Sequence, residues 1–371
     1  MKYLFLISLL LLNILIVNSS FQNTIFAKSN LDKKGKNLFL SPLSIFQVLG
    51  LTTNGAAGVT QKEMLTALEV SSIDNLNNIN FQLIKAIKKF KTTGLANAVM
   101  TKFSPIKSFS KMCDRYEAPV EKLISLEQVN GWCSKKTHGK ITKILNKLTP
   151  DIVMILLNAV YFKGDWEFPF NPMLTRDGQF GDANSRKKTV KMMTQTQKFD
   201  YYIDRSVQAI ELPYKNDSMS ALIILPYAGA DTDNFVNTLK INENYLNRIM
   251  KGMTKTMVKL SLPKFQIEFE SSLNKVLNKL GMRQAFTGQA DFSGLTASGG
   301  IHIDDVIHKT FLKVDEHGSE AAAVTAVVMT KSAPPIPKAS MNVNRPFIFI
   351  LKSKLLPKDN DILFIGKIMD I

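Results

Sequence analysis

The chain of 371 residues has few of the side chains that most often build catalytic and metal sites, with 2 cysteines and 4 histidines. Two cysteines exclude a disulfide-based scaffold and a cysteine-rich zinc module. Glycine and proline, at 19 and 14 residues, are too few for a collagenous or low-complexity chain. The remaining composition, 45% hydrophobic and 21% charged, is typical of a folded globular protein with a core of its own.

Acidic residues are also scarce. The chain has 31 Asp and Glu against 47 Lys and Arg, which leaves a formal charge of +16. This balance favours anionic polymers, membrane surfaces or acidic proteins as partners. Nucleic acid is a poor candidate because the sequence contains no nucleic-acid recognition module.

Motifs of common enzymes are missing as well. The chain contains no G-x-S-x-G, H-E-x-x-H, C-x-x-C or G-x-G-x-x-G motif and no Walker loop. His302 and Asp304 would share one face of a strand, but two ligands are too few for a metal site, so we interpret residues 302–305 as a solvated turn. No local spacing of Ser, His and Asp marks a nucleophile with its base. We predict that the protein is not an enzyme and has no metal.

Long apolar runs are confined to the N-terminus. Residues 4–17 form a largely apolar stretch that is too short for a membrane span, which needs about 20 apolar residues. The small residues Ser19 and Ser20 suit cleavage after Ser19. We therefore expect a signal peptide over residues 1–19 and a secreted, extracellular protein with no membrane anchor.

Export bears on the two cysteines and on one asparagine. An oxidising environment makes a disulfide between Cys113 and Cys133 feasible, and two buried free thiols are the alternative. Asn216 begins an Asn-Asp-Ser sequon in a polar break between apolar runs, so we expect it to be glycosylated.

The first half of the chain has helical periodicity, and the second half consists mainly of strand-like runs. Leu83, Ile84 and Ile87 would lie on one face of a helix, with Lys85 and Lys88 on the other. Short apolar runs bounded by Gly, Pro or charge are typical of buried strands. Such runs cover residues 152–162, 219–225, 346–351 and 362–365, and a helical stretch covers 273–280. The pattern predicts an α+β fold, and no repeat or linker marks a domain boundary.

An unusual segment, residues 318–329, consists of small and β-branched side chains and is followed by prolines at 334, 335 and 337. Proline cannot donate to a central strand, so we expect this part to form an extended, exposed loop. The earlier part could enter a packed sheet, because alternate side chains are small: Ser319, Ala321, Ala323, Thr325 and Val327. An alanine-rich helix is the alternative, since alanine favours helices. A helix would explain neither the alternation nor the prolines.

Motifs along the chain resemble those of the serpins. Residues 316–323 are similar to the hinge of a serpin reactive-centre loop, and residues 344–347 are similar to the signature that follows this loop. Further matches occur in serpin order at residues 37–45, 137–141, 157–166, 211–214, 262–265 and 290–294. One such motif would be weak, but this many in order identify the chain as serpin-like from about residue 25 to its end.

The resemblance implies a single domain over residues 20–371 with a serpin fold. Such a fold is α+β, with three β-sheets, eight to nine helices and an exposed reactive-centre loop, here about residues 316–343. It also implies a monomeric suicide-substrate inhibitor. A serine protease cleaves the loop and is trapped as an acyl-enzyme while the loop inserts into the central sheet. A non-inhibitory carrier, chaperone or storage serpin is the alternative, but the uncharged, proline-free inward face of the hinge favours an inhibitor.

The resemblance also assigns site residues. The hinge residues are Glu316, Gly318, Ser319, Glu320, Ala321, Ala322, Ala323 and Thr325. The shutter, where the central sheet opens, corresponds to Ser41, Ser44, Asn158 and His308, and Trp166 corresponds to the breach, where the loop first enters. Counting from Glu316 places the reactive bond at Ser332–Ala333. Lys331–Ser332 would suit a trypsin-like protease, and a bond after Met329 would suit a chymotrypsin-like one.

Basic clusters indicate a second kind of partner. Some serpins bind heparin-like polyanions through a basic helix, and Lys85, Lys88, Lys89 and Lys91 lie in about that region. Further candidates are Lys135, Lys136, Lys140, Lys143 and the run 186–188. A solvated lysine face is the alternative. We expect no cofactor apart from a candidate glycosaminoglycan activator.

Overall fold

The computed structural model describes residues 19–89, 93–184, 186–215, 218–241, 243–297, 299–319, 336–356 and 362–371. Several predictions made above fall outside these residues. They concern the first 18 residues of the expected signal peptide, Lys91, Asn216, and all hinge and reactive-bond residues from Glu320 to Ala333.

Nine α-helices occur within the described residues. Capping residues mark the starts of some of them: the Ser72 side chain accepts a hydrogen bond from the Asn75 backbone, and Pro42 occupies the first turn after Ser41. The helices are α2 (Ser19–Asp32), α3 (Pro42–Thr53), α4 (Gly58–Ala67), α5 (Ile73–Ile87), α6 (Lys107–Tyr116), α7 (Leu126–Lys136), α8 (Thr232–Ile241), α9 (Glu243–Lys251) and α10 (Asn274–Lys279). None of these described helices has the length and apolar character needed to cross a bilayer.

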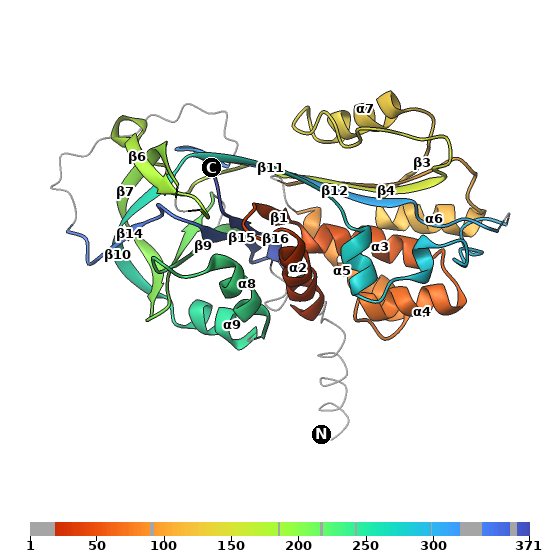
Figure 1. Ribbon diagram of the computed structural model, residues 1–371, viewed down its shortest axis with the longest axis horizontal. Helices are drawn as coiled ribbons and strands as arrows, with labels where there is room; N and C mark the ends of the chain where they lie inside the picture. Colours follow the sequence, from red (N-terminus) through yellow and green to blue (C-terminus); the bar gives the residue numbers. More distant parts are fainter. Residues whose placement is uncertain are drawn as a thin grey trace, which may run out of the picture.

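A seven-stranded sheet forms the centre of the molecule. Its order is β3-β2-β4-β12-β13-β5, and β11 also pairs with β12. The bounds are β2 (Thr93–Thr101), β3 (Val120–Lys122), β4 (Met154–Phe162), β5 (Gly164–Asp165), β11 (Phe265–Ser272), β12 (Asp305–Val314) and β13 (Gly318–Ser319). In Figure 1, α7 lies on one side of this sheet, and α3, α5 and α6 lie on the other.

The remaining strands form a nine-stranded sheet. Its order is β1-β16-β15-β9-β8-β7-β10-β14, with β6 paired to β7. The bounds are β1 (Leu38–Leu40), β6 (Arg176–Gly181), β7 (Lys187–Ile203), β8 (Val207–Pro213), β9 (Met219–Pro226), β10 (Thr254–Pro263), β14 (Ala339–Asn342), β15 (Phe347–Ser353) and β16 (Ile362–Ile368).

The number of sheets differs from the expected three. The cause is β7, a strand of 17 residues that pairs with different strands along its length. It pairs with β6 near its start, with β10 through its middle and with β8 at residues 200–203. This last pairing joins two of the expected sheets into one hydrogen-bonded sheet, so the described residues form two.

Most predicted elements are confirmed. The apolar runs form the buried strands β4, β9, β15 and β16, and the stretch 273–280 contains α10. On the predicted apolar face of α5, Leu83 is buried and Ile84 and Ile87 are half-buried against the same core, while Lys85 and Lys88 are exposed on the other face. The fold is α+β, with helices concentrated in the first half of the chain.

Two hydrophobic cores lie on opposite faces of the seven-stranded sheet, and each contains one cysteine. Cys113 belongs to the core under α3 and Cys133 to the core under α7. Both are free thiols, and the sheet lies between them, so the disulfide alternative is wrong. Burial raises the pKa of each thiol to about 12, which makes both unreactive near neutral pH.

Candidate functional site

The candidate site is the seam between the central strands β4 and β12. These strands run parallel and pair from Ile155–Asp305 to Tyr161–Phe311. Beyond this point the two strands diverge, and the short strand β13 lies between β12 and β5. Ser319 pairs with Val314 on one side, and Gly318 pairs with Asp165 on the other. The chain that leaves β12 therefore turns back and begins an additional strand, β13, at the end of the seam where β12 ends.

Gly318 fits this position because it has no side chain. A Cβ atom there would lie 2.0 Å from the carbonyl oxygen of Gly164, far inside van der Waals contact. The neighbouring Ser319 is fully buried, and its hydroxyl lies 2.6 Å from the Tyr214 hydroxyl. These two residues are the described part of the predicted hinge that enters the sheet.

Trp166, predicted at the breach, is buried beside β13. Its indole nitrogen donates to the Asp315 carbonyl at 3.0 Å, and its backbone nitrogen donates to the His317 carbonyl at 2.8 Å. Its ring stacks on Tyr214, with centroids 4.3 Å apart and an interplanar angle of 18°. Trp166 thus holds both the turn before β13 and the tyrosine that contacts Ser319.

Glu316, the first predicted hinge residue, is buried and ion-paired. Lys264 contacts one carboxylate oxygen at 2.7 Å, and the Thr175 hydroxyl donates to the other at 2.8 Å. Burial alone would raise the pKa of Glu316, but the hydrogen bonds from Lys264 and Thr175 lower it overall. The carboxylate is therefore charged. It joins the turn before β13 to Lys264, which precedes β11, and to Thr175, which precedes β6.

The four predicted shutter residues meet in one hydrogen-bonded network on the face of the sheet under α3. His308 and Asn158 are paired across β12 and β4, and Asn97 lies opposite Asn158 on β2. The Asn158 amide nitrogen donates to the Ser44 hydroxyl and to Asn97, and the Asn158 oxygen contacts His308 Nδ1. The backbone nitrogen of Ser41 donates to His308 Nε2 at 3.1 Å.

This geometry defines the state of His308. One ring nitrogen accepts from Ser41 and the other contacts the Asn158 oxygen, which is the pattern of a neutral imidazole. The ring is fully buried, and burial lowers its pKa to about 3. His308 is therefore a neutral bridge between the N-terminus of α3 and the seam.

Sequence reasoning missed Asn97, Gln47 and Tyr214. Asn97 is central to the shutter network, and its amide donates to Gln47 at 3.5 Å. The signal for Asn97 is visible in the sequence, because it is the only amide side chain inside the strand 93–101. A lone polar residue within a buried strand needs a partner. Tyr214 ends the family motif at residues 211–214, but that motif assigns it no role, and its contact with Ser319 spans 105 residues of sequence.

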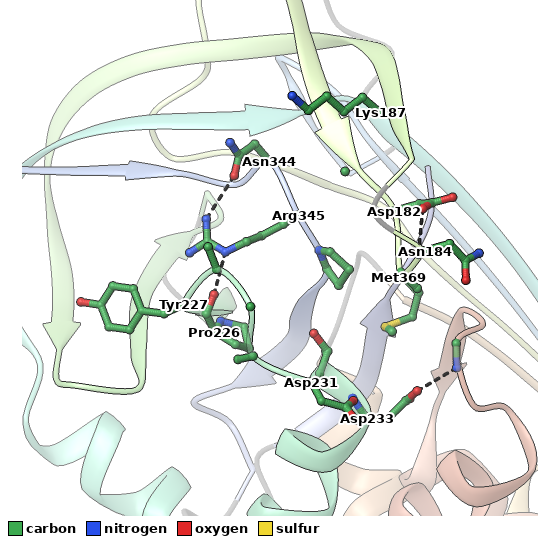
Figure 2. Close-up of a pocket in the computed structure, with 18 of the residues that line it drawn as sticks. Asp182, Asn184, Lys187, Pro226, Tyr227, Asp231, Asp233, Asn344, Arg345 and Met369 are labelled. Carbon is green, nitrogen blue, oxygen red and sulfur yellow. Dashed lines mark hydrogen bonds between the residues drawn. The ribbon is translucent and has the colours of Figure 1, made fainter.

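The signature residues after the loop line a cavity of about 880 Å³ (Figure 2). Arg345 donates from Nε to the Pro226 carbonyl at 2.8 Å and from Nη1 to the Asn344 side chain at 3.1 Å. The Gly181 nitrogen donates to the Asn344 carbonyl at 2.9 Å. The signature thereby fixes the chain between β14 and β15 to the ends of β6 and β9.

Carboxylates on the cavity wall are already engaged within the protein. Asp182 forms an ion pair with Arg186 at 2.8 Å, and Asp233 pairs with the buried Lys367. These contacts make the cavity a structural junction near the far end of the loop.

The described basic candidates are exposed but differ in their surroundings. At the end of α5, Lys85 and Lys89 are exposed, and Lys88 pairs with Glu117. Four further lysines are exposed around the end of α7: Lys135, Lys136, Lys140 and Lys143. Arg186 and Lys188 are paired with Asp182 and Asp370.

Residues 302–304 form an irregular, partly buried segment without a turn, and Asp305 begins β12, so the predicted solvated turn is wrong. His302 lies 3.4 Å from Asp304, and Asp304 accepts hydrogen bonds from the Val153 and Met154 nitrogens. No group of three or more His, Cys, Asp or Glu residues in the described part of the chain could hold a metal ion.

Comparison with known proteins agrees with this architecture. Residues 17–371 match the family model described as serpin (serine protease inhibitor). Human serpin B3 is 30% identical over 94% of this chain and 97% of its own, and serine protease inhibitor 42Dd of Drosophila melanogaster is 33% identical over 90% and 91%. The native structure of tengpin, a thermophilic serpin, superposes with a TM-score of 0.86 at 32% identity and covers 95% of this chain and 93% of its own. The chain therefore belongs to the serpin family of protease inhibitors and is not an enzyme.

Proposed function

We propose that this serpin is a secreted suicide-substrate inhibitor of serine proteases. The observation that carries the proposal is β13, a strand that begins between β12 and β5 while the rest of the seam is closed by direct β4–β12 pairing. Cleavage of the loop would free its N-terminal part to continue this strand down the seam. The bound protease, joined to the loop as an acyl-enzyme, would be carried along and distorted.

The register of β13 defines where the inserted residues would lie. Continued residue by residue, the pairings of Ser319 with Val314 and Gly164 place Thr325 between His308 and Asn158. The same register places Glu320 on the opposite face, between Lys313 and Lys163. Insertion would thus replace the direct His308–Asn158 contact with contacts to a small hydroxyl residue. It would also put Glu320, the charged hinge residue that follows β13, between two ammonium groups.

The energy of insertion is large enough for this role. A new central strand adds roughly ten backbone hydrogen bonds at about 0.5–1.5 kcal/mol net each, hence on the order of 10 kcal/mol. A typical domain is stable by only about 5–15 kcal/mol. Insertion could therefore disrupt the structure of a trapped protease.

Thr325→Arg tests the mechanism, because an arginine cannot fit between His308 and Asn158 under α3. We expect this variant to be cleaved without forming an SDS-stable complex, whereas the parent protein forms one. Ile336→Arg is a matched control, since Ile336 is exposed and lies beyond the reactive bond. Absence of a complex between the parent protein and every serine protease tested would contradict the inhibitory function.

The target class follows from the reactive bond, for which Lys331 and Ser332 are the leading candidates and Met329 is the third. Cleavage after Lys331 favours a trypsin-like enzyme, and cleavage after Ser332 or Met329 favours a small-residue or chymotrypsin-like enzyme. Mass spectrometry of the C-terminal peptide released by a protease panel identifies the bond. Mass spectrometry of the intact secreted protein checks the proposed cleavage after Ser19 and the proposed glycosylation at Asn216.

A further inference from the structure

A second cavity, of about 190 Å³, lies between the end of α2, the strands β1 and β11, and the short helix α10. Helix α2 leads through a turn into β1, and β11 leads directly into α10, so two continuous pieces of chain enclose the cavity. The residues that line it belong neither to the seam strands β4 and β12 nor to β13. Asn30, on a different side of α2, contacts α8 instead, through a hydrogen bond of 3.0 Å to the Asp233 carbonyl. The cavity is therefore separate from the site described above.

One wall of the cavity is apolar. Leu38 and Leu40 are alternate residues of β1, so their side chains point to the same side of the strand, and both are fully buried. Phe269 of β11 and Val276 of α10 complete this wall and are also buried. An apolar cavity of about 150 Å³ is large enough to hold benzene in another protein. This cavity therefore has room for a six-membered ring with a short side chain.

The polar side of the cavity contains a buried hydroxyl group without a partner. Ser29 lies in the last turn of α2, lines the cavity and is only 7% exposed. Its hydroxyl has no hydrogen-bond partner among the described residues. A buried hydroxyl that stays unpaired costs free energy. An oxygen atom of a molecule bound in the cavity would remove this cost.

Lys33 follows Ser29 by about one helical turn and also lines the cavity. Its ammonium group lies 5.5 Å from the centre of the Phe269 ring, so a positive charge and the apolar wall border the same space. Among the described residues, no carboxylate forms an ion pair with this ammonium group. The one carboxylate in the lining, Asp32, is already shared by Lys275 at 3.1 Å and Lys279 at 2.9 Å. The uncompensated charge of Lys33 therefore favours an anion in the cavity.

We propose that this cavity binds a small monocarboxylic acid whose apolar body packs against β1, Phe269 and α10. Its carboxylate would accept hydrogen bonds from the Ser29 hydroxyl and the Lys33 ammonium group. An inorganic anion would leave the apolar wall unfilled, and a neutral apolar molecule would leave Ser29 and Lys33 without a partner. The site adds a small-molecule ligand to a protein whose proposed partner is a protease, and it does not depend on loop insertion.

Titration of the full-length protein with phenylacetate tests the site. Phenylacetate combines one six-membered ring with a carboxylate, and NMR spectra of protein labelled at leucine and valine methyl groups locate where it binds. We expect the signals of Leu38, Leu40 and Val276 to shift with a Kd on the order of 1 mM, as for other ligands of about ten non-hydrogen atoms. Phenylacetamide has the same shape without the charge, so it should bind about tenfold more weakly.

Three variants separate the contributions to binding. Lys33→Met removes the ammonium group and nearly keeps the length of the side chain, so it should weaken phenylacetate binding about tenfold and leave phenylacetamide binding unchanged. Ser29→Ala should weaken phenylacetate binding about threefold without destabilising the free protein, because the hydroxyl has no partner there. Lys36→Met is the matched control: Lys36 is an exposed lysine of the same turn that does not line the cavity, and its variant should keep the parental affinity.

Two results would overturn the proposal. Unshifted signals of Leu38, Leu40 and Val276, or shifts confined to other methyl groups, would show that the cavity does not bind the acid. Equal affinity for phenylacetamide, or equal weakening by Lys33→Met and Lys36→Met, would contradict recognition of a carboxylate by Lys33. Formation of the SDS-stable protease complex is measured separately and reports only on the proposed inhibitory function.

Discussion

At the scale of single residues, buried polar side chains mark the places where the central sheet would open in the proposed mechanism. His308 and Asn158 bridge the seam midway along β12 and β4, and Glu316 and Trp166 hold the turn that follows β12. Buried polar groups are costly unless they are paired. The His308–Asn158 contact joins the two strands that insertion would separate, and the contacts of Trp166 with Asp315 and His317 hold the turn that leads into β13. The same groups therefore hold the closed form together and define where it can part.

The neutral state of His308 leads to a pH prediction. Its folded pKa of about 3 lies below the unfolded value near 6.5, so the unfolded chain takes up a proton that the native ring does not. The free energy of unfolding should therefore fall as the pH drops below about 6.5, by up to about 1.4 kcal/mol per pH unit. Urea unfolding between pH 7.5 and 4.5 measures the free energy of unfolding of the parent protein and of His308→Gln. The slope of this free energy against pH should be shallower in His308→Gln. Equal slopes in the two proteins would contradict the buried neutral histidine.

Glu320 provides a prediction specific to the inserted state. Between Lys313 and Lys163 its carboxylate would make favourable but partly exposed contacts, each contributing about 0.2–1 kcal/mol. Glu320→Lys should lower the stability of the loop-cleaved protein by about 1 kcal/mol or more, because three like charges would meet. The uncleaved protein should be unaffected. Thermal unfolding of both forms gives the comparison, and a loss of the same size before cleavage would refute the register.

At the scale of elements, β13 lies where the loop would enter the seam in the proposed mechanism. Gly318→Ala would place a Cβ atom against the Gly164 carbonyl, 2.0 Å away before relaxation, so β13 should leave the gap. We expect a loss of about 1–3 kcal/mol in the native protein. Hydrogen exchange should become faster at the backbone amide of Trp166, which donates to the His317 carbonyl. Unchanged exchange there would contradict the close packing at Gly318.

The elements differ in how far the sequence predicts them. Apolar runs such as 152–162 and 219–225 identify buried strands, because a strand buried on both faces needs apolar side chains throughout. The merging of two sheets along β7 depends on pairings such as Asp200–Glu211, which no composition or periodicity reveals. The shutter residues are identified through family motifs. The role of Asn97, and the contacts of Lys309 with Glu268, Glu270 and the Lys143 carbonyl, are seen only when chain segments distant in sequence are brought together.

At the scale of the whole molecule, the seam between β4 and β12 is held closed in two ways. The two strands pair directly, and other parts of the chain cover both faces of the sheet at this point. Helix α3 contacts the seam through Ser41 and Ser44. On the opposite face, residues 137–153, which lead from α7 to β4, contact it through the Lys143 carbonyl, which accepts a hydrogen bond from Lys309. The native sheet is thus held closed beyond β13, and the proposed mechanism would add a strand by parting β4 from β12. This arrangement implies that the uncleaved protein is less stable than its loop-inserted form.

Thermal unfolding before and after cleavage of the loop tests this claim most directly. The protein is cleaved by a protease that it does not trap, and the two forms are compared at equal concentration and pH. A gain on the order of 10 kcal/mol from the new strand predicts that the melting temperature rises by about 20 °C or more. An equal or lower melting temperature in the cleaved protein would contradict loop insertion and, with it, the proposed mechanism.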